Sequence, residues 1–275
     1  MKIAATRGVH GGQKRFAALV SAMCVLAYST SVPAQAAGLK EKILPSAGPR
    51  IAIIIDDAGN HMLGTKDILS LKRPMTVAIM PFLPSSKEDA IAAHKAGDEV
   101  ILHLPMEPMR GKRSWLGPGA ITTSMSDAEI KEQVRKDLDN IPYVVGLNNH
   151  MGSKASSDER VVRDIVNVAK ERGVYIVDSA TSMKSKMATV AREMGVPYVK
   201  RRVFLDDVHR PDFVARQVRQ LVEDARTSGW SVGIGHVGKF GASTYKGIVE
   251  MLPYIDKEGV KMVRVSDIIR QGMNK

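Results

Sequence analysis

Cysteine is nearly absent from this 275-residue chain, since Cys24 is the only one. Internal disulfides therefore play no part, and stability must come from burial of a hydrophobic core. The sequence also lacks internal repeats, low-complexity tracts and any basic run interleaved with aromatic residues. The last absence disfavours nucleic acid as a partner, although the formal net charge is +11.

The first 36 residues have the three-part layout of a secretory signal peptide. A basic stretch without acidic residues precedes an apolar run over 16–32 and small residues at Ala34 and Ala36. The run is shorter than the ~20 residues that span a bilayer comfortably, and no second run of that length occurs later in the chain. We expect cleavage after Ala36, export and a periplasmic location. The alternative is an uncleaved N-terminal anchor, which would also place the rest of the chain outside the cytoplasm.

The chain that remains after cleavage suits one domain. Removing 36 of 275 residues leaves 239, and four basic residues leave with them, so the net charge falls from +11 to +7. This charge favours acidic envelope or membrane surfaces and anionic glycans as partners, and the alternative is a solvated basic surface. We expect a flexible lead-in over 37–49 and a single catalytic domain over 50–275, a length normal for an α/β barrel.

Short apolar runs alternate with helical patterns along this domain. The predicted strands are Ile51–Ile55, Met75–Met80, Glu99–Leu104, Tyr143–Leu147, Val174–Val177, Val196–Val199, Val203–Leu205, Trp230–Ile234 and Val260–Val265. The clearest predicted helices are Ser86–Lys95, Ser126–Leu138, Ser157–Glu171 and Pro211–Arg226. About seven alternations predict a parallel α/β sheet, open or closed. The irregular stretch over 105–123 is expected to form a lid or a binding loop.

Ionisable residues gather where the predicted strands end. They are Asp56, Asp57, His103, His150, Asp178, Asp206, Asp207 and His236. Such residues are disfavoured inside a parallel sheet, and loops at the carboxyl edge of α/β sheets converge on the active site. The pattern therefore predicts one site.

Asp56 and Asp57 come after five apolar residues, and two carboxylates there are costly unless each has a partner. Because adjacent residues point in different directions, one could bind a cation while the other faces substrate or water. The alternative is that one of them caps a helix predicted to begin at His61.

His103 and His150 end two further strands, with Glu107 and Asn149 close to them in sequence. Neutral imidazoles and a carboxylate together suit zinc, with an open position left for water. We expect a divalent metal, zinc first, bound by His103, His150 and one of the two aspartates.

His236 ends a glycine-flanked strand and is well placed as a general acid or base. Asp178 could orient a catalytic group through a hydrogen bond. Asp206 and Asp207 could do the same, or could form ion pairs with the basic residues 200–202 just before them.

The order of these motifs resembles the divergent polysaccharide deacetylase family, a distant relative of the metal-dependent polysaccharide deacetylases. The residues that carry the resemblance are Ile54–Gly59, His103–Pro108, Gly146–Ser153, Val177–Ser179, Val203–Asp207 and Ile234–His236. The resemblance covers nearly all of residues 50–271. It implies a distorted (β/α) barrel with about seven parallel strands.

The resemblance also implies roles for individual residues. Asp56 would be the general base and Asp57 a metal ligand together with His103. His236 would be the general acid, and Asp178 the aspartate that tunes the catalytic pair. Glu107 stands where the better-known enzymes have their second histidine ligand, so His150 completes the ligand set. We expect Glu107, Asn149 and Asp207 to contact the substrate.

Two features of the better-known enzymes are missing: the arginine–proline–tyrosine motif that helps to hold the oxyanion, and a tryptophan shortly after the position of Asp178. Three hypotheses remain open. The first is a metal-dependent hydrolase, similar to a carbohydrate deacetylase, that acts on an envelope or extracellular polysaccharide. The second is an inactive glycan-binding or envelope-assembly protein on the same fold. The third is a protein that buffers or delivers zinc.

Overall fold

The computed structural model describes residues 48–272 of the chain. The predicted signal peptide over 1–36 and nearly all of the predicted lead-in lie outside these residues. Within residues 48–272, no helix combines the length and the apolar character that crossing a membrane requires.

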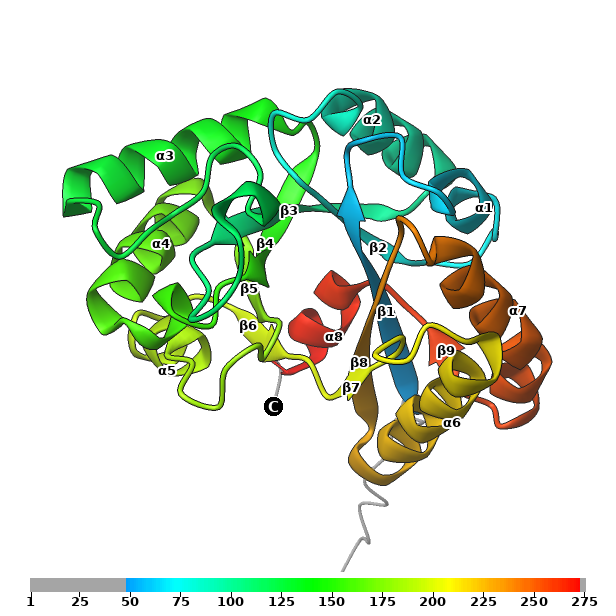
Figure 1. Cartoon of the computed structure of the whole chain (residues 1–275). Coiled ribbons are helices and arrows are strands. Elements are labelled where there is room, and N and C mark those ends of the chain that lie inside the picture. The colour runs from blue at the N-terminus through cyan, green and yellow to red at the C-terminus, as the bar shows by residue number, and fades with distance from the viewer. Residues whose placement is uncertain (1–47, 273–275) are drawn as a thin grey trace, which may run out of the picture. The chain divides into compact units, whose positions relative to one another are not determined.

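The described residues form one parallel sheet surrounded by helices (Figure 1). The strands are β1 (Arg50–Ala58), β2 (Thr76–Ile79), β3 (Glu99–Met106), β4 (Val144–Met151), β5 (Tyr175–Asp178), β6 (Tyr198–Lys200), β7 (Val203–Phe204), β8 (Trp230–His236) and β9 (Lys261–Met262). The helices are α1 (Thr65–Leu69), α2 (Ser86–Ala96), α3 (Asp127–Asn140), α4 (Glu159–Arg172), α5 (Met187–Glu193), α6 (Pro211–Ser228), α7 (Gly241–Lys257) and α8 (Val265–Gly272), with short 3-10 turns η1 (Arg113–Trp115) and η2 (Ala155–Ser157).

The sheet is a curled, incompletely closed barrel. Its strand order is β6-β5-β4-β3-β2-β1-β8-β7, and β9 pairs with the start of β1. β6 and β7 are consecutive in the chain but are the two edge strands, so the barrel remains open between them. The predicted distorted (β/α) barrel is confirmed. The described residues contain nine strands rather than about seven, and three of the nine are only two or three residues long.

Both faces of the central strands are buried, which explains their continuous apolar runs. On β1, Ile51, Ile53 and Ile55 pack in the larger outer cluster with the surrounding helices. Ala52 and Ile54 pack in a second cluster with residues of α8. Figure 1 shows α8 within the curve of the sheet. Asp56 continues the inward-facing series, so β1 itself aims this carboxylate into the barrel.

The helix predictions hold where local signals are strong. Ser126 and Glu129 form the predicted capping box at the start of α3. The predicted strand Val260–Val265 is wrong in its second half, because β9 ends at Met262 and Val265 begins α8. The physical reason is tertiary. Val265 and two isoleucines of α8 pack together against the inward-facing residues of the strands, because the helical spacing puts these three side chains on one face.

The amino edge of the sheet is closed by a hydrogen-bond network around Glu99. Its Oε1 atom accepts hydrogen bonds from the Thr76 hydroxyl, from the Tyr175 hydroxyl at 2.6 Å and from the Ser266 backbone N–H at the start of α8. Gly146 faces the Tyr175 ring on the neighbouring strand, and a Cβ atom there would lie 2.5 Å from it. The polar groups of this network are therefore satisfied, and the space around them is filled.

Candidate metal centre and catalytic site

A bulge at the end of β1 turns two adjacent carboxylates toward one site. The pairing of β1 with β2 loses register between Ile55 and Ala58, and Asp57 has a positive φ of 70°. Such a backbone is costly for a residue other than glycine and tends to occur at functional sites. As expected, the shortest contacts of the two carboxylates have different partners: Asp56 bonds the Asn148 amide, and Asp57 lies against two histidines. Neither caps α1, whose N-cap is Gly64.

Asp57, His103 and His150 bring three donor atoms to one point. Asp57 Oδ1 lies 3.2 Å from His103 Nε2 and 3.1 Å from His150 Nδ1, and the two nitrogens are 3.2 Å apart. Zinc bonds to nitrogen and oxygen are about 2.0–2.2 Å long, so tetrahedral geometry separates neighbouring donors by about 3.4 Å. The donor triangle therefore has the size that a tetrahedral metal ion requires.

Hydrogen bonds outside the triangle set the tautomer of each histidine. Asn148 donates its amide to Asp56, so its oxygen faces His103 Nδ1 at 2.7 Å and must accept a proton from it. His150 Nε2 lies 3.1 Å from the Trp115 carbonyl, which can only accept. Each ring therefore donates away from the triangle and turns its free lone pair inward, the arrangement typical of metal-ligating histidines.

The charge and packing of the triangle also fit a cation. Asp57 Oδ1 is buried and has no hydrogen-bond partner. Burial would raise the pKa of Asp57, but the two imidazoles beside it hold that pKa well below its usual value. Burial opposes protonation of His103, but the charges of Asp56 and Asp57 raise its pKa. The same negative field favours a bound metal ion.

Asp56 lies behind this triangle, almost completely buried. Its Oδ1 accepts the Asn148 amide at 2.8 Å, and its Oδ2 lies 3.7 Å from His103 Nδ1. Burial raises the pKa of Asp56, against the lowering effect of the neighbouring histidines. A carboxylate in such a setting is a stronger proton acceptor than an exposed one.

His236 forms a close pair with Asp206. Asp206 Oδ1 lies 2.9 Å from His236 Nδ1, and Oδ2 accepts the His236 backbone N–H and the Thr244 hydroxyl. Burial would lower the pKa of His236, but the bond to Asp206 and the charge of Asp56 raise it to about 9. Burial likewise opposes ionisation of Asp206, and the bond to His236 keeps its pKa low. His236 is therefore oriented and protonated near neutral pH, as a general acid requires.

The sequence left the partner of Asp206 open, and the structure decides it. Asp206 bonds His236, while Arg201 donates to the carbonyls of Ser179 and Ala180, so the alternative ion pair of Asp206 with the preceding basic residues is wrong. Asp178 accepts the Ala180 N–H.

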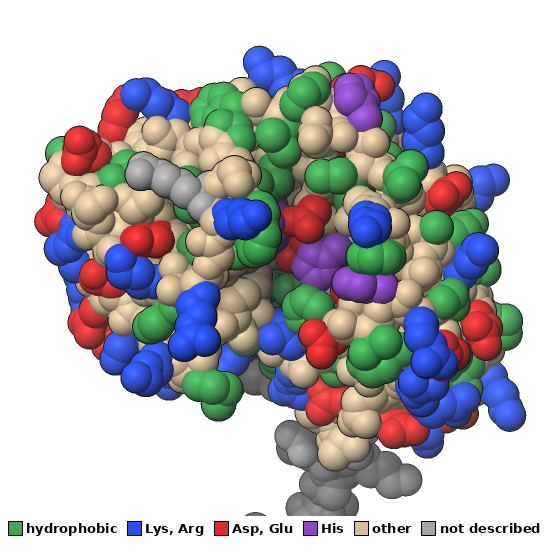
Figure 2. Space-filling view, viewed as in Figure 1, with side chains coloured by type: hydrophobic (Ala, Val, Ile, Leu, Met, Phe, Trp, Pro, Cys, Tyr) green, Lys and Arg blue, Asp and Glu red, His purple; other side chains and the backbone are tan. Residues whose placement is uncertain are grey.

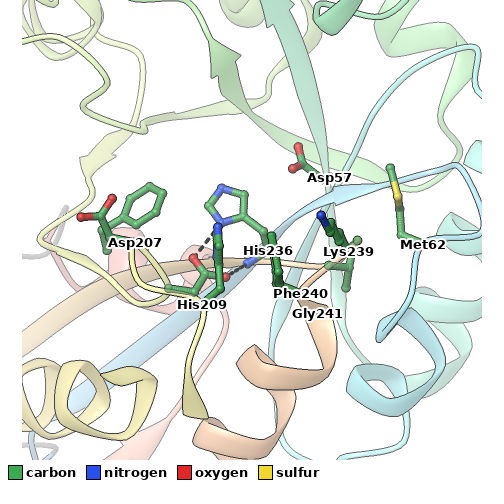
Figure 3. Close-up of a pocket in the computed structure, with 12 residues that line it drawn as sticks. Asp57, Met62, Asp207, His209, His236, Lys239, Phe240 and Gly241 are labelled. Carbon is green, nitrogen blue, oxygen red and sulfur yellow. Dashed lines mark hydrogen bonds and ion pairs between the residues drawn. The ribbon is translucent and has the colours of Figure 1, made fainter. Parts of the chain in front are cut away.

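A pocket of about 520 Å³ opens beside these groups (Figure 3). Asp57, His236 and Asp207 line it, and Asp207 is exposed there. His209 and Phe240 also line it and stack with ring centroids 4.0 Å apart. Neither residue could be predicted from the strand-end pattern, because neither ends an apolar strand. In the view of Figure 3 the His236 ring lies between Asp207 and Asp57.

Two of the expected substrate-binding residues are already engaged by the protein. Glu107 accepts hydrogen bonds from the Thr123 backbone and hydroxyl and pairs with Lys154 at 2.8 Å. Glu107 thereby joins the two ends of the loop over residues 107–123. This loop places the Trp115 carbonyl against His150 of the candidate metal centre. Asn149 accepts the Ser179 N–H and donates to the Met151 carbonyl and the Thr181 hydroxyl, which joins the ends of β4 and β5.

Comparisons with known proteins place this site in a family context. The model of the divergent polysaccharide deacetylase family matches residues 53–269. The uncharacterized protein YibQ of Escherichia coli K12 is 30% identical over 227 residues, which cover 82% of this chain and 69% of YibQ. An uncharacterized protein of Haemophilus influenzae is 31% identical over 190 residues, which cover 69% of this chain and 67% of that protein.

Solved structures agree at the level of the fold. An uncharacterized protein from Agrobacterium tumefaciens C58 superimposes with a TM-score of 0.75 at 19% identity, covering 81% of this chain and 89% of the other. A peptidoglycan N-acetylglucosamine deacetylase, solved with 4-naphthalen-1-yl-N-oxidanyl-benzamide, superimposes with a TM-score of 0.51 at 12% identity, covering 82% and 90%. The family match extends over most of the described residues and includes every residue of the site, so this chain belongs to the divergent polysaccharide deacetylase family.

Proposed function

We propose that this protein is an exported, metal-dependent hydrolase that removes an acyl group, acetyl first, from an envelope or extracellular polysaccharide. The observation that carries the proposal is the donor triangle of Asp57, His103 and His150, whose tautomers and size suit a metal ion. Asp56 and the His236–Asp206 pair, at the ends of the paired strands β1 and β8, then supply a base and an acid.

The site residues account for each proton of the reaction. Asp57, His103 and His150 would hold a metal ion, which would supply Lewis-acid polarisation of the acyl carbonyl and lower the pKa of the attacking water. Asp56, held by Asn148, takes one proton from that water as its oxygen bonds to the carbonyl carbon. His236, held by Asp206, gives a proton to the leaving nitrogen or oxygen as the bond to the acyl carbon breaks.

Zinc is the metal that we propose. Two imidazoles and one carboxylate with a further position left free match catalytic zinc sites better than the all-oxygen sites of magnesium or calcium. The ligand of the similar peptidoglycan deacetylase is an N-oxidanyl amide, a hydroxamate, and hydroxamates chelate metal ions. A hydroxamate is therefore a suitable probe of the proposed centre.

A second candidate is an inactive glycan-binding or envelope-assembly protein. It is favoured by the missing arginine–proline–tyrosine motif, and by Glu107 and Asn149, whose polar groups are occupied within the protein. This candidate predicts glycan binding that does not depend on the metal ligands.

The decisive measurement is the metal content of the purified protein. We expect about one zinc ion per chain in the wild type and almost none in His103→Ala/His150→Ala. His94→Ala is the matched control, because His94 stacks on Tyr143 away from the triangle and should leave the metal content unchanged. Absence of metal from the wild type after incubation with zinc would contradict the hydrolase proposal.

Turnover is tested by release of acetate from acetylated glycans, with and without a hydroxamate. Asp56→Asn should keep the metal and lose the activity, which separates the base from the ligands. Wild-type metal binding without any acetate release from a panel of N- and O-acetylated glycans would favour the binding protein. Export is tested separately: the protein recovered from the periplasm should begin at Ala37.

A further inference from the structure

Exposed apolar side chains are concentrated on one edge of the barrel. Among the described residues, eleven large hydrophobic side chains are exposed. Seven of them belong to the loops that come after the carboxyl ends of strands: Leu63, Phe82, Met109, Trp115, Met183, Val208 and Phe240. The loops that lead from helices into strands, at the opposite edge, contribute only Tyr143 within the described part of the chain. A scatter of single exposed residues needs no explanation, but such a gathering on one face does.

The same loops are basic. The loops that come after β1 to β5, β7 and β8 contain eight lysines and arginines but only four aspartates and glutamates. Glu107 and Lys154 pair with each other, Asp158 caps α4, and Asp206 and Arg210 pair with His236 and Asp212. The basic excess of these loops remains when these pairs are set aside. The loops that lead from helices into strands contain two basic and two acidic residues.

Apolar and basic groups alternate around the entrance of the pocket. The Lys112 ammonium lies 5.9 Å from the Trp115 ring, and the Lys239 ammonium lies 5.2 Å from the Phe240 ring. Figure 2 shows hydrophobic and basic side chains around the central hollow, in which acidic and histidine side chains meet. We call the seven apolar residues, together with Lys112, Lys184, Lys186 and Lys239, the apolar–basic rim.

The composition of the rim selects its partner. Leu63, Met109, Met183 and Val208 have no flat ring on which a sugar could stack, so a polysaccharide does not account for them. A second copy of the chain would bring one basic rim against another, and like charges repel. Apolar side chains beside lysines match a bilayer with anionic headgroups, where the apolar groups enter the interface and the lysines contact the charge.

We propose that the apolar–basic rim docks on the surface of an anionic lipid bilayer. The pocket would then face the bilayer and act on glycan close to or attached to the membrane. Docking does not require that the proposed hydrolysis occurs, so the two proposals can fail independently.

Binding to vesicles tests the surface. We expect the wild-type protein to sediment with vesicles of phosphatidylcholine and phosphatidylglycerol in a two-to-one ratio, and to remain in solution with pure phosphatidylcholine. Lys184→Gln/Lys186→Gln should weaken binding roughly fivefold for each lysine removed, and high salt should weaken it further. Leu63→Ser/Met183→Ser should weaken it as well. Neither pair belongs to the metal centre or the pocket lining.

Matched controls come from other surfaces of the same chain. Lys257→Gln/Lys261→Gln removes the same charge from the other edge, and Ile91→Ser/Val249→Ser removes exposed apolar groups from α2 and α7. Both should bind as the wild type does. Equal binding by all four double variants would overturn the proposal. A dimer of the wild type that Leu63→Ser/Met183→Ser dissociates, without vesicle binding, would assign the rim to a second copy and would also overturn it.

Trp115 reports the orientation directly. The other tryptophan, Trp230, begins β8 at the opposite edge, so quenching by brominated lipid should come from Trp115 and should disappear in Trp115→Phe. Vesicle binding without such quenching would show that another part of the chain, including residues 1–47, makes the contact, and would exclude docking through the rim.

Discussion

Each edge of the curled sheet buries a carboxylate, and the two carboxylates differ in their partners. At the amino edge, one oxygen of Glu99 accepts three hydrogen bonds and α8 covers the network. At the carboxyl edge, Asp57 Oδ1 is buried without a hydrogen-bond partner and faces two imidazole lone pairs. A buried carboxylate whose hydrogen bonds are all formed stabilises a fold. A buried carboxylate oxygen that lacks a hydrogen bond and faces imidazole lone pairs indicates a binding site for a cation.

The difference arises from the segments that cover each edge. Between β9 and the end of the described chain, α8 enters the barrel and fills its amino end with apolar side chains. At the carboxyl end no helix of residues 48–272 enters, and the loops instead surround the pocket. The comparison predicts that changes at the carboxyl edge alter chemistry, while changes at the amino edge alter stability.

Asp56→Asn should have the largest effect. If Asp56 is the base, turnover should fall on the order of 10²- to 10⁴-fold, while the amide keeps the shape of the site and the metal content stays the same. Glu99→Gln is the matched change at the other edge and should leave turnover near the wild-type value. Acetate release per bound zinc ion measures both. Similar losses in the two variants would erase the proposed distinction between the edges.

Glu99→Ala should reverse this pattern. Loss of the Glu99 carboxylate leaves the buried Tyr175 and Thr76 hydroxyls without their acceptor. We therefore expect the free energy of unfolding to fall by about 3 kcal/mol. Tyr175→Phe, which removes one donor, should cost about 1 kcal/mol. Urea unfolding measures stability, and zinc content measures the other edge. Loss of zinc from folded Glu99→Ala would show that the two edges are coupled.

Asp206→Asn tests the ion pair with His236 through its pH dependence. Because the folded pKa of His236 is raised to about 9, the pair stabilises the fold fully below the unfolded pKa of about 6.5 and progressively less as pH rises through 9. At pH 6 the free energy of unfolding of the wild type should exceed that of the variant by about 2 kcal/mol, and this difference should become smaller by pH 10. A gap that is constant over this range would mean that His236 is not protonated in the fold.

Glu107→Gln should have the smallest effect on stability. Its partner Lys154 is about half exposed, so the ion pair contributes well under 1 kcal/mol, about what surface pairs give. The loop tied by Glu107 positions the Trp115 carbonyl against His150, so zinc affinity should nevertheless weaken modestly. Competition with a zinc chelator measures this, and Lys136→Gln, which removes an exposed ion pair with Glu132, is the control. Unchanged affinity would limit Glu107 to loop stability.

Much of the site could be predicted because the relevant residues end apolar strands. Asp56, Asp57, His103, His150 and His236 are conspicuous for this reason, and parallel strands bring such ends to one edge. The position of Asp206 at a strand end could be predicted as well, but its hydrogen-bond partner could not. β7 pairs with β8, and that pairing brings Asp206 to a histidine 30 residues further along the chain.

His209 and the rim residues could not be predicted from periodicity. They lie on loops, where a side chain's neighbours depend on how other loops fold. His209 reaches the pocket by stacking on Phe240 from a different loop.

The sequence by itself determined the parallel α/β architecture and the edge at which the aspartates and histidines gather, because strand burial and strand ends are properties of local apolar runs. Only the tertiary structure decided which donors converge, which histidine lone pairs point inward and which carboxylate holds His236. It also decided that the last apolar segment becomes a helix inside the barrel. These outcomes depend on distances of about 3 Å between residues far apart in the chain, and such distances exist only once the sheet has curled.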